Sequence, residues 1–235
     1  MQPTTVKSAY WDGFRAGTPF LLMAIPFATL FGVVAAEAGL QLAQIIGFSL
    51  LVIAGAAQYA ALQLMIENAA IGFVLLAALA VNLRMAMYSA SLVPHLGAAP
   101  IWQRALVAYV NFDQCYMLSM ARYEDDPSEA VGAKVAFFLG VASPLMPVWL
   151  GSTIVGALIG AAIPPEYALD FIVPIMFLAM VGPALKSLAH VAAALTSAIV
   201  ALALFWMPAG TGLLVAAGAA MVVGATLETW METRG

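Results

Sequence analysis

The sequence predicts an all-α, polytopic helical membrane protein with about seven or eight transmembrane helices, several of them broken by proline or glycine. Of the 235 residues, 64% are hydrophobic and only 9% are charged, whereas soluble domains average about 45–50% apolar and about 25% charged residues. The apolar residues also gather in runs of the roughly 20 residues that a helix needs to cross a ~30 Å hydrocarbon core. The polar stretches between these runs are short, which predicts one membrane domain over residues 1–235.

Eight apolar segments have the length and composition of membrane spans. They cover residues 16–36, 42–66, 69–93, 103–121, 133–162, 167–187, 188–207 and 210–229. Residues 1–15 are polar and aromatic and lack the apolar core of a cleavable signal, which predicts a short cytoplasmic N-terminal segment. The longest polar stretch, residues 122–134, is predicted to be a hydrated loop. Segments 42–66 and 69–93 could instead be re-entrant or broken, which would leave seven spans.

The positions of Lys and Arg predict the orientation of the chain, because cytoplasmic loops are enriched in these residues. With eight spans, one side of the membrane holds six of them: Lys7, Arg15, Arg122, Lys134, Lys186 and Arg234. The other side holds Arg104, and Arg84 is buried or near that surface. Both termini are therefore predicted to be cytoplasmic.

The sequence contains no pattern typical of catalysis, metal binding or nucleic-acid binding. The single cysteine, Cys115, excludes an internal disulfide framework, and the two histidines, His95 and His190, stand far apart in the sequence. HExxH, GxSxG and GxxxxGK[ST] motifs do not occur. Eight Lys and Arg residues in a chain of net charge −4 make no basic stripe for phosphate contacts. We expect no enzyme activity, no metal, no cofactor and no nucleic-acid partner.

Several predicted spans carry a helix-breaking residue near their middle. These residues are Pro26, Gly55, Pro144, Pro147 and Pro174. Proline removes a backbone donor and frees carbonyl groups that lipid cannot satisfy, so breaks persist where they face protein or water. In secondary transporters such breaks form the substrate site at mid-membrane, although single prolines also kink or pack membrane helices. Taken together, these positions predict a cavity near the middle of the membrane.

Asp113 is the leading candidate for a functional charge. An ionisable group inside a span costs a few kcal/mol and needs a partner or a water path. Helical spacing places Tyr109 and Tyr116 on the same face as Asp113. A carboxylate between two phenols could bind the ammonium group of a substrate or relay a proton. The alternative is a structural acid paired with an arginine of a neighbouring helix.

Arg84, two residues after Asn82, is the matching basic candidate. Its planar fork suits a carboxylate, but it could also snorkel or neutralise Asp113, and an Arg–Asp pair could open to hold both ends of a zwitterion. Gln58 could contact a polar group of the substrate or hydrogen-bond across helices as packing. Asp170 is a secondary candidate, because an acid in the first turn of a helix can also act as a cap.

Five segments of the chain, in this order, resemble the AzlC family. They are FRAGTPFLLMAIPFATLFGVVAAEAG, AGAAQYAALQL, NLRMAMYSASLVPHL, FDQCY and DFIVPIMFLAMV, and the match extends from about residue 12 to 230. The family is the large subunit of a two-component exporter of branched-chain amino acids. The resemblance implies efflux of leucine, isoleucine, valine or close analogues across the inner membrane of a bacterial cell. It also implies coupling to a proton or ion gradient and a small AzlD-type membrane subunit as partner.

The family motifs coincide with the candidate residues. They fall on residues 82–84 (NLR), 54–58 (AGAxQ), Asp113 and residues 170–171 (an acid followed by Phe). The chain departs from the family pattern at Met85, where a histidine is common, and at Gln114, where an acid is common, with Phe112 in place of the usual threonine. A simple proton relay would lack these two groups. Two alternatives stay open: a transporter of another small amphiphilic or zwitterionic metabolite, and a scaffold or regulatory subunit without a substrate site.

Overall fold

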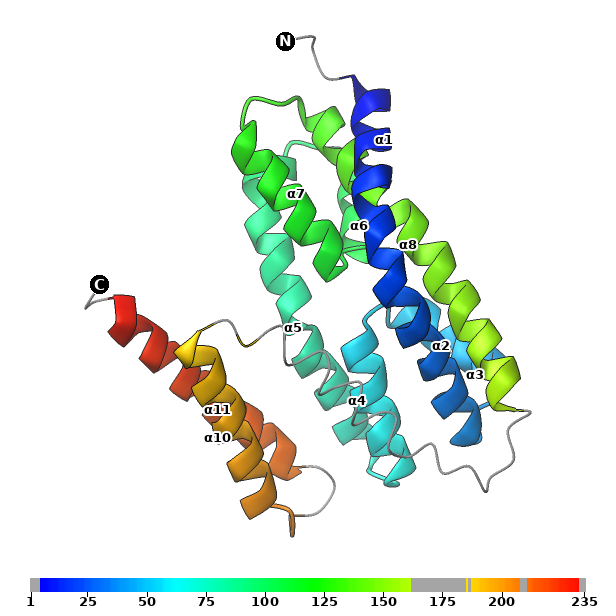
Figure 1. Cartoon of the computed structure of the whole chain (residues 1–235), viewed down its shortest axis with the longest axis vertical. Helices are drawn as coiled ribbons and strands as arrows, with labels where there is room; N and C mark the ends of the chain where they lie inside the picture. The colour runs from blue at the N-terminus through cyan, green and yellow to red at the C-terminus, as the bar shows by residue number, and fades with distance from the viewer. Residues whose placement is uncertain (1–4, 162–184, 186, 208–210, 233–235) are drawn as a thin grey trace. The chain divides into compact units, whose positions relative to one another are not determined.

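The computed structural model describes residues 5–161, 185, 187–207 and 211–232 (Figure 1). In this part of the chain every regular element is a helix and there is no strand, so the predicted all-α class is confirmed. Four of the described helical segments are long and apolar enough to cross a membrane: Val6–Glu37, Ile71–Leu96, Val131–Gly160 and Thr211–Met231. Pro174 and Asp170 lie outside the described residues.

The chain divides into two compact units. Unit 1 contains Met1–Tyr59 and Ala78–Pro165, and unit 2 contains Ala60–Ala77 and Glu166–Gly235. Because helices α4 (Gly55–Ile66) and α5 (Ile71–Leu96) each run from one unit into the other, the units are not separate stretches of sequence. The single domain over residues 1–235 stays a prediction. All the described candidate residues belong to unit 1.

The first long helix begins earlier than the predicted start at residue 16. α1 (Val6–Gly17) follows a capping box between Thr5 and Ser8, and it continues through the short 3-10 helix η1 (Thr18–Phe20) into α2 (Leu21–Glu37). The sequence 1–15 looks like a polar tail, but one face of α1 is made of small residues that are buried. That face packs against α8 (Val131–Gly160), so residues from Val6 onward belong to the helical core.

Glycines bring α1, α2 and α8 into close contact. A Cβ on Gly13 would overlap the carbonyl oxygen of Phe137, and a Cβ on Gly156 would overlap that of Thr29. Small residues at helix interfaces let the backbones approach closely. Because the paired residue numbers rise together, from residues 13 and 137 to residues 29 and 156, α8 runs parallel to α1 and α2. These helices form the centre of unit 1.

The predicted span 42–66 is two short helices. α2 ends in a Schellman motif, in which Gly39 has φ +84° and the Leu40 N–H donates to the Ala35 carbonyl at 3.1 Å. α3 (Leu42–Leu51) is then only 10 residues long, about 15 Å, which is half of a hydrocarbon core. Residues 52–54, here called the first break, separate it from α4, which begins at Gly55.

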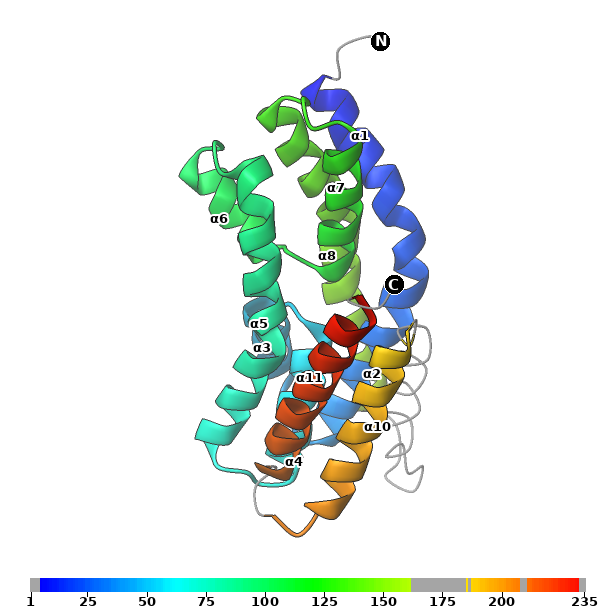
Figure 2. The same ribbon diagram turned by 90° about the vertical axis from the view of Figure 1, so that its left-hand side faces the viewer.

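The predicted span 103–121 is also interrupted. α6 (Ile101–Tyr109) has 9 residues and α7 (Asp113–Asp125) has 13, so neither is long enough to cross a membrane. Residues 110–112, here called the second break, lie between them. Figure 2 shows α6 leading away from the C-terminal end of α5 and α7 leading back toward the same end. The segment is therefore a hairpin that enters unit 1 and returns, and not a span.

This hairpin corrects the predicted position of one basic residue. Because the segment 101–125 returns to the end where it entered, Arg104 lies at the same end of unit 1 as Arg122 and Lys134, and not at the opposite end. The N-terminus of α1, with Lys7, is also at this end (Figure 1). Lys7, Arg104, Arg122 and Lys134 therefore lie at one end of unit 1. The cytoplasmic location of the termini stays a prediction.

The predicted hydrated loop 122–134 is shorter in the structure, because α7 extends to Asp125 and α8 begins at Val131. Arg122, in the last turn of α7, donates a hydrogen bond to Glu129 (Nη2 to Oε1, 2.7 Å) and lies 3.6 Å from a carboxylate oxygen of Asp12 on α1. Hydrogen bonding to Glu129 is the largest cause that raises the pKa of Arg122. Arg122 therefore joins the end of α7 to the α7–α8 loop and to the middle of α1.

The prolines within the long helices do not interrupt them. Pro26 lies inside α2, and Pro144 and Pro147 lie inside α8. The missing N–H of Pro144 would have bonded the carbonyl of Gly140, and the hydroxyl of Ser143 donates to that carbonyl instead, at 2.9 Å. A side-chain donor of this kind lets a membrane helix continue through proline. The predicted breaks at Pro26, Pro144 and Pro147 are therefore wrong.

Unit 2 contains a helical hairpin near the C-terminus. α10 (Leu188–Ala203) begins after Ser187, whose side chain accepts a hydrogen bond from the His190 N–H. It packs along α11 (Thr211–Glu232), the two coloured yellow to red in Figure 1. Gly224 of α11 faces Ala193 of α10, so small residues again allow the two helices to lie close together.

Candidate functional site

An ion pair joins the middle of α5 to the start of α7. Arg84, near the centre of the 26-residue α5, places Nη1 2.8 Å from Oδ2 of Asp113. Asp113 is the first residue of α7, where the N–H groups of the first turn also favour a negative charge. The two side chains are 32% and 44% exposed. The pair is therefore close enough to be an ion pair and open enough for another molecule to compete for it.

Asn111 anchors the second break next to this pair. Its side chain is almost fully buried, and Nδ2 donates to the Met85 carbonyl at 3.4 Å and to the Ser89 hydroxyl at 3.3 Å. Both acceptors are on α5, so Asn111 fixes the break against the helix that carries Arg84. The sequence analysis missed this role. The signal for it was an amide residue two positions before the intramembrane acid.

The two tyrosines predicted to flank Asp113 take different positions. Tyr116 stacks on Tyr88 of α5, with ring centroids 4.2 Å apart, and its hydroxyl lies 3.0 Å from the Ser91 hydroxyl. Tyr109 instead donates to the carbonyl of Leu50, at the end of α3, at 2.8 Å. The prediction that Tyr109 shares a face with Asp113 is wrong, because the helix is interrupted between them. Tyr109 therefore connects the end of α6 to the end of α3.

Gln58 lies beside the first break and not beside the ion pair. Its side chain is fully buried, and Nε2 donates to the hydroxyl of Ser49 at 3.0 Å. This hydrogen bond joins α4 to α3 across the first break. The next residue, Tyr59, donates to the carbonyl of Phe27 at 3.0 Å. Gln58 therefore stabilises the first break in this structure.

Several buried polar atoms around the two breaks have no hydrogen-bond partner. In unit 1 they include Gln58 Oε1, Asn82 Oδ1, Arg84 Nε, Asn111 Oδ1 and Asp113 Oδ1. Nearly all buried polar atoms in proteins are paired, so unpaired ones point to a ligand, an ion or water. Three of these atoms belong to residues at the second break. Arg84 and Asp113 contact each other, and Asn111 contacts α5 next to Arg84. The second break is therefore the better candidate for a binding site.

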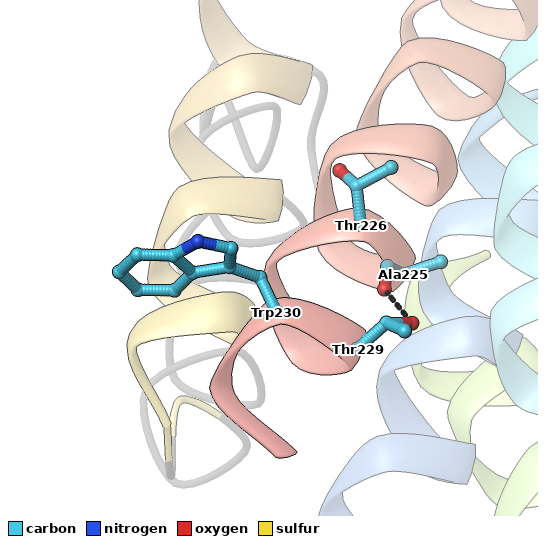
Figure 3. Close-up of a pocket in the computed structure, with 4 residues that line it drawn as sticks. All are labelled: Ala225, Thr226, Thr229 and Trp230. Carbon is cyan, nitrogen blue, oxygen red and sulfur yellow. Dashed lines mark hydrogen bonds between the residues drawn. The ribbon is translucent and has the colours of Figure 1, made fainter. Parts of the chain in front are cut away.

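A second concave surface lies on α11. It is a hollow of about 400 Å³ lined by Ala225, Thr226, Thr229 and Trp230 (Figure 3). The hydroxyls of Thr226 and Thr229 donate to the Val222 and Ala225 carbonyls of the same helix, each at 2.8 Å. The hollow has no charged residue in its lining, and the predicted candidates lie elsewhere. No group of three His, Cys, Asp or Glu residues able to hold a metal occurs within the described ranges.

A helical membrane protein with an ion pair beside an interrupted helix has the architecture of a membrane transporter. The model of the AzlC protein family matches residues 19–163, more than half of the chain. The chain therefore belongs to the AzlC family and has a transporter-type role in a membrane.

Two relatives have similar lengths. The chain is 24% identical over 220 residues to "Inner membrane protein YgaZ" of Escherichia coli, covering 88% of this chain and 86% of that protein. It is 28% identical over 211 residues to an "Uncharacterized membrane protein" of Archaeoglobus fulgidus, covering 86% of this chain and 88% of that one. No solved structure matches the chain.

Proposed function

We propose that this chain is the permease subunit of an exporter of branched-chain amino acids, driven by a proton or ion gradient, and that it is not an enzyme. The observation that carries the proposal is the Arg84–Asp113 ion pair beside the second break. Membership of the AzlC family supports the choice of leucine, isoleucine, valine or a close analogue. The relative named as an inner membrane protein supports the bacterial inner membrane as the location.

The ion pair suits a zwitterion because each charge can exchange one partner for another. An amino acid that enters between the side chains offers its carboxylate to Arg84 and its ammonium group to Asp113. Both charges stay paired throughout, which avoids the cost of leaving either one alone in a medium of low dielectric constant. The fork of arginine can hold the carboxylate with two hydrogen bonds. Release then requires that Asp113 return to Arg84 or take up a proton.

A small AzlD-type membrane subunit is the proposed partner. The long helices Ile71–Leu96 and Thr211–Met231 have only 11% and 12% of their most apolar windows buried within the chain. This apolar surface needs apolar neighbours, since these side chains cannot face water. Membership of the AzlC family supports a small helical subunit as the neighbour of part of it.

The test is efflux of labelled leucine from preloaded cells that express the chain alone or with the small subunit. The Asp113→Asn variant removes the negative charge of the pair, and Asp125→Asn, at the exposed end of the same helix, is the matched control. We expect efflux that needs both subunits, that fails in Asp113→Asn and that persists in Asp125→Asn. An excess of lysine should not compete. Leucine efflux that is equally fast in both variants would contradict a role of Asp113 in binding.

A scaffold or regulatory role is the second candidate. One observation favours it: at 2.8 Å the two charges already neutralise each other within the chain, as a structural pair would. The double variant Arg84→Gln with Asp113→Asn separates the two functions, because it removes both charges and leaves neither unpaired. Export that survives in this variant would favour the scaffold. Export that is lost, with normal insertion and assembly, would favour the substrate site.

A further inference from the structure

We propose that protons travel between Asp113 and the end of unit 1 at the α7–α8 loop along the face where α5 meets α7. This inference rests on the proposed export function and adds the identity and the route of the coupling ion. The route, here called the polar ladder, consists of Arg84, Tyr88, Ser91 and His95 on α5 with Asp113, Tyr116 and Tyr123 on α7.

The residues of the polar ladder face one another at successive turns. The residues of α5 follow at intervals of three or four, so they share one helix face. Next to the ion pair, the rings of Tyr88 and Tyr116 stack, and the Ser91 hydroxyl lies 3.0 Å from that of Tyr116. Beyond them, the ring of His95 lies 5.3 Å from that of Tyr123. The contacts proceed in the same order along both helices, from Asp113 toward the loop.

The chemistry of these groups is that of a relay. A hydroxyl both donates and accepts a hydrogen bond, and either oxygen of the Ser91–Tyr116 pair can be the donor. An imidazole ring has one nitrogen that can donate a proton and one that can accept it. Polar side chains inside membrane helices commonly mark proton relays, and ordered water bridges the gaps between them. Leu83 and Met87, which flank the ladder on α5, are apolar and exposed.

The proposed proton transfer runs between His95 and Asp113, at the two ends of the polar ladder. Asp113 faces Arg84 and Tyr88 on α5, with Cys115 and Tyr116 following it on its own helix. A proton on the His95 imidazolium passes through the hydroxyls to the Asp113 carboxylate, which becomes a neutral carboxylic acid. The imidazole left behind takes the next proton from water. The ammonium group of a substrate and this proton therefore compete for the same carboxylate.

The far end of the ladder reaches charged groups at the α7–α8 loop. Tyr123 faces the ring of His95 and donates its hydroxyl to the Lys134 carbonyl at 2.8 Å, and the Lys134 ammonium lies 5.5 Å from the Tyr123 ring. The ion pair between Arg122 and Glu129 lies in the adjoining loop region. Water that reaches this loop can therefore supply or accept the proton at His95.

The direct test follows the protonation of Asp113 after a drop in pH, by the infrared absorption of its carboxylic acid group, in the purified full chain. The band is assigned by its absence in Asp113→Asn. We expect His95→Gln and Tyr116→Phe to slow its appearance by on the order of tenfold or more. The matched controls are His190→Gln, on the exposed face of α10, and Tyr10→Phe, whose hydroxyl bonds Ser143. Equal rates in all four variants, or no band from Asp113, would overturn the polar ladder.

A second measurement separates this inference from the proposed function. The chain and its small subunit in vesicles are assayed for leucine uptake driven by a pH gradient and for leucine exchange without a gradient. We expect His95→Gln to reduce driven uptake by about tenfold or more while exchange stays within about twofold. Loss of both in the same proportion would show a structural role and overturn the ladder. If the unmodified protein exchanges no leucine, the proposed substrate fails, while the infrared result still decides the ladder.

Discussion

The two breaks of unit 1 have the same order of elements but are stabilised by different forces. At the first break, Ile53 and Ala54 are buried, and aromatic rings surround the start of α4, with Phe27 and Tyr59 in edge contact at 4.9 Å. At the second break, Asn111 bonds α5 and the next helix begins with a charge. Apolar packing and hydrogen bonds between neutral groups, such as that from Gln58 to Ser49, therefore hold the first break, whereas the second break also has an ion pair.

This difference identifies which break is suited to bind a ligand. A close-packed turn loses contacts when it opens, and no charged residue lies in residues 49–60 to pair with the charges of a zwitterion. A turn held by an ion pair can exchange that pair for the charges of a zwitterion. The hydrogen bond from Tyr109 to the Leu50 carbonyl links the two breaks. We interpret the first break as the fixed support and the second as the binding element.

The largest effect is expected at the second break. Arg84→Gln should lower the free energy of unfolding by about 2–3 kcal/mol, because it leaves Asp113 without its counter-charge, although partial exposure reduces the cost below that of a fully buried pair. Chemical denaturation of the detergent-solubilised chain measures this value. Adding Asp113→Asn should restore most of the loss. A double variant that is less stable than Arg84→Gln would show that the charges do not interact.

An intermediate effect is expected at the first break. In Gly55→Val, the new Cβ would overlap the ring of Phe27 and lie 2.8 Å from the ring of Trp149. Such overpacking should cost about 1–2 kcal/mol, measured by the same denaturation. Gly47→Val on α3 is the matched control, because a Cβ there meets no atom within 4 Å. If both variants lose the same stability, helix propensity and not packing sets the cost.

The smallest effect is expected at the link between the breaks. Tyr109→Phe removes only the hydrogen bond to the Leu50 carbonyl on an exposed side chain, so stability should fall by about 0.5–1 kcal/mol. If the link transmits movement, export of leucine should slow by more than this loss of stability explains. Tyr10→Phe, which removes a tyrosine hydroxyl bonded to Ser143, is the control for both measurements. Unchanged export in Tyr109→Phe would show that the breaks move independently.

Several elements of the fold and of the site follow from local properties of the sequence. Composition predicts the membrane class, because too few charged residues are present to cover a surface in water. Helical spacing places Arg84, Tyr88, Ser91 and His95 on one face, and in the structure this face contacts α7. An intramembrane acid and an intramembrane arginine predict each other, because each needs a partner of opposite charge.

Other features depend on contacts between segments that are distant in sequence. Residues 103–121 are apolar enough for a span, but the hydrogen bonds from Asn111 to α5 stabilise a break at 110–112. Pro144 is compatible with a continuous helix because Ser143 satisfies the carbonyl that it frees. The polar residues of α1 make this segment look like a tail in the sequence. Its small buried residues pack closely only because α8 places glycines opposite them.

By itself, the sequence determined the helical membrane class and the family, and it singled out Arg84 and Asp113 as the charged candidates. These depend on composition, periodicity and motif order, which are properties of neighbouring residues. Only the tertiary structure decided where helices are interrupted, which side of unit 1 Arg104 occupies and which partner Tyr109 binds. The physical reason is that a helix continues or breaks according to whether distant groups satisfy its backbone and polar side chains. Those groups come together only when the chain is folded.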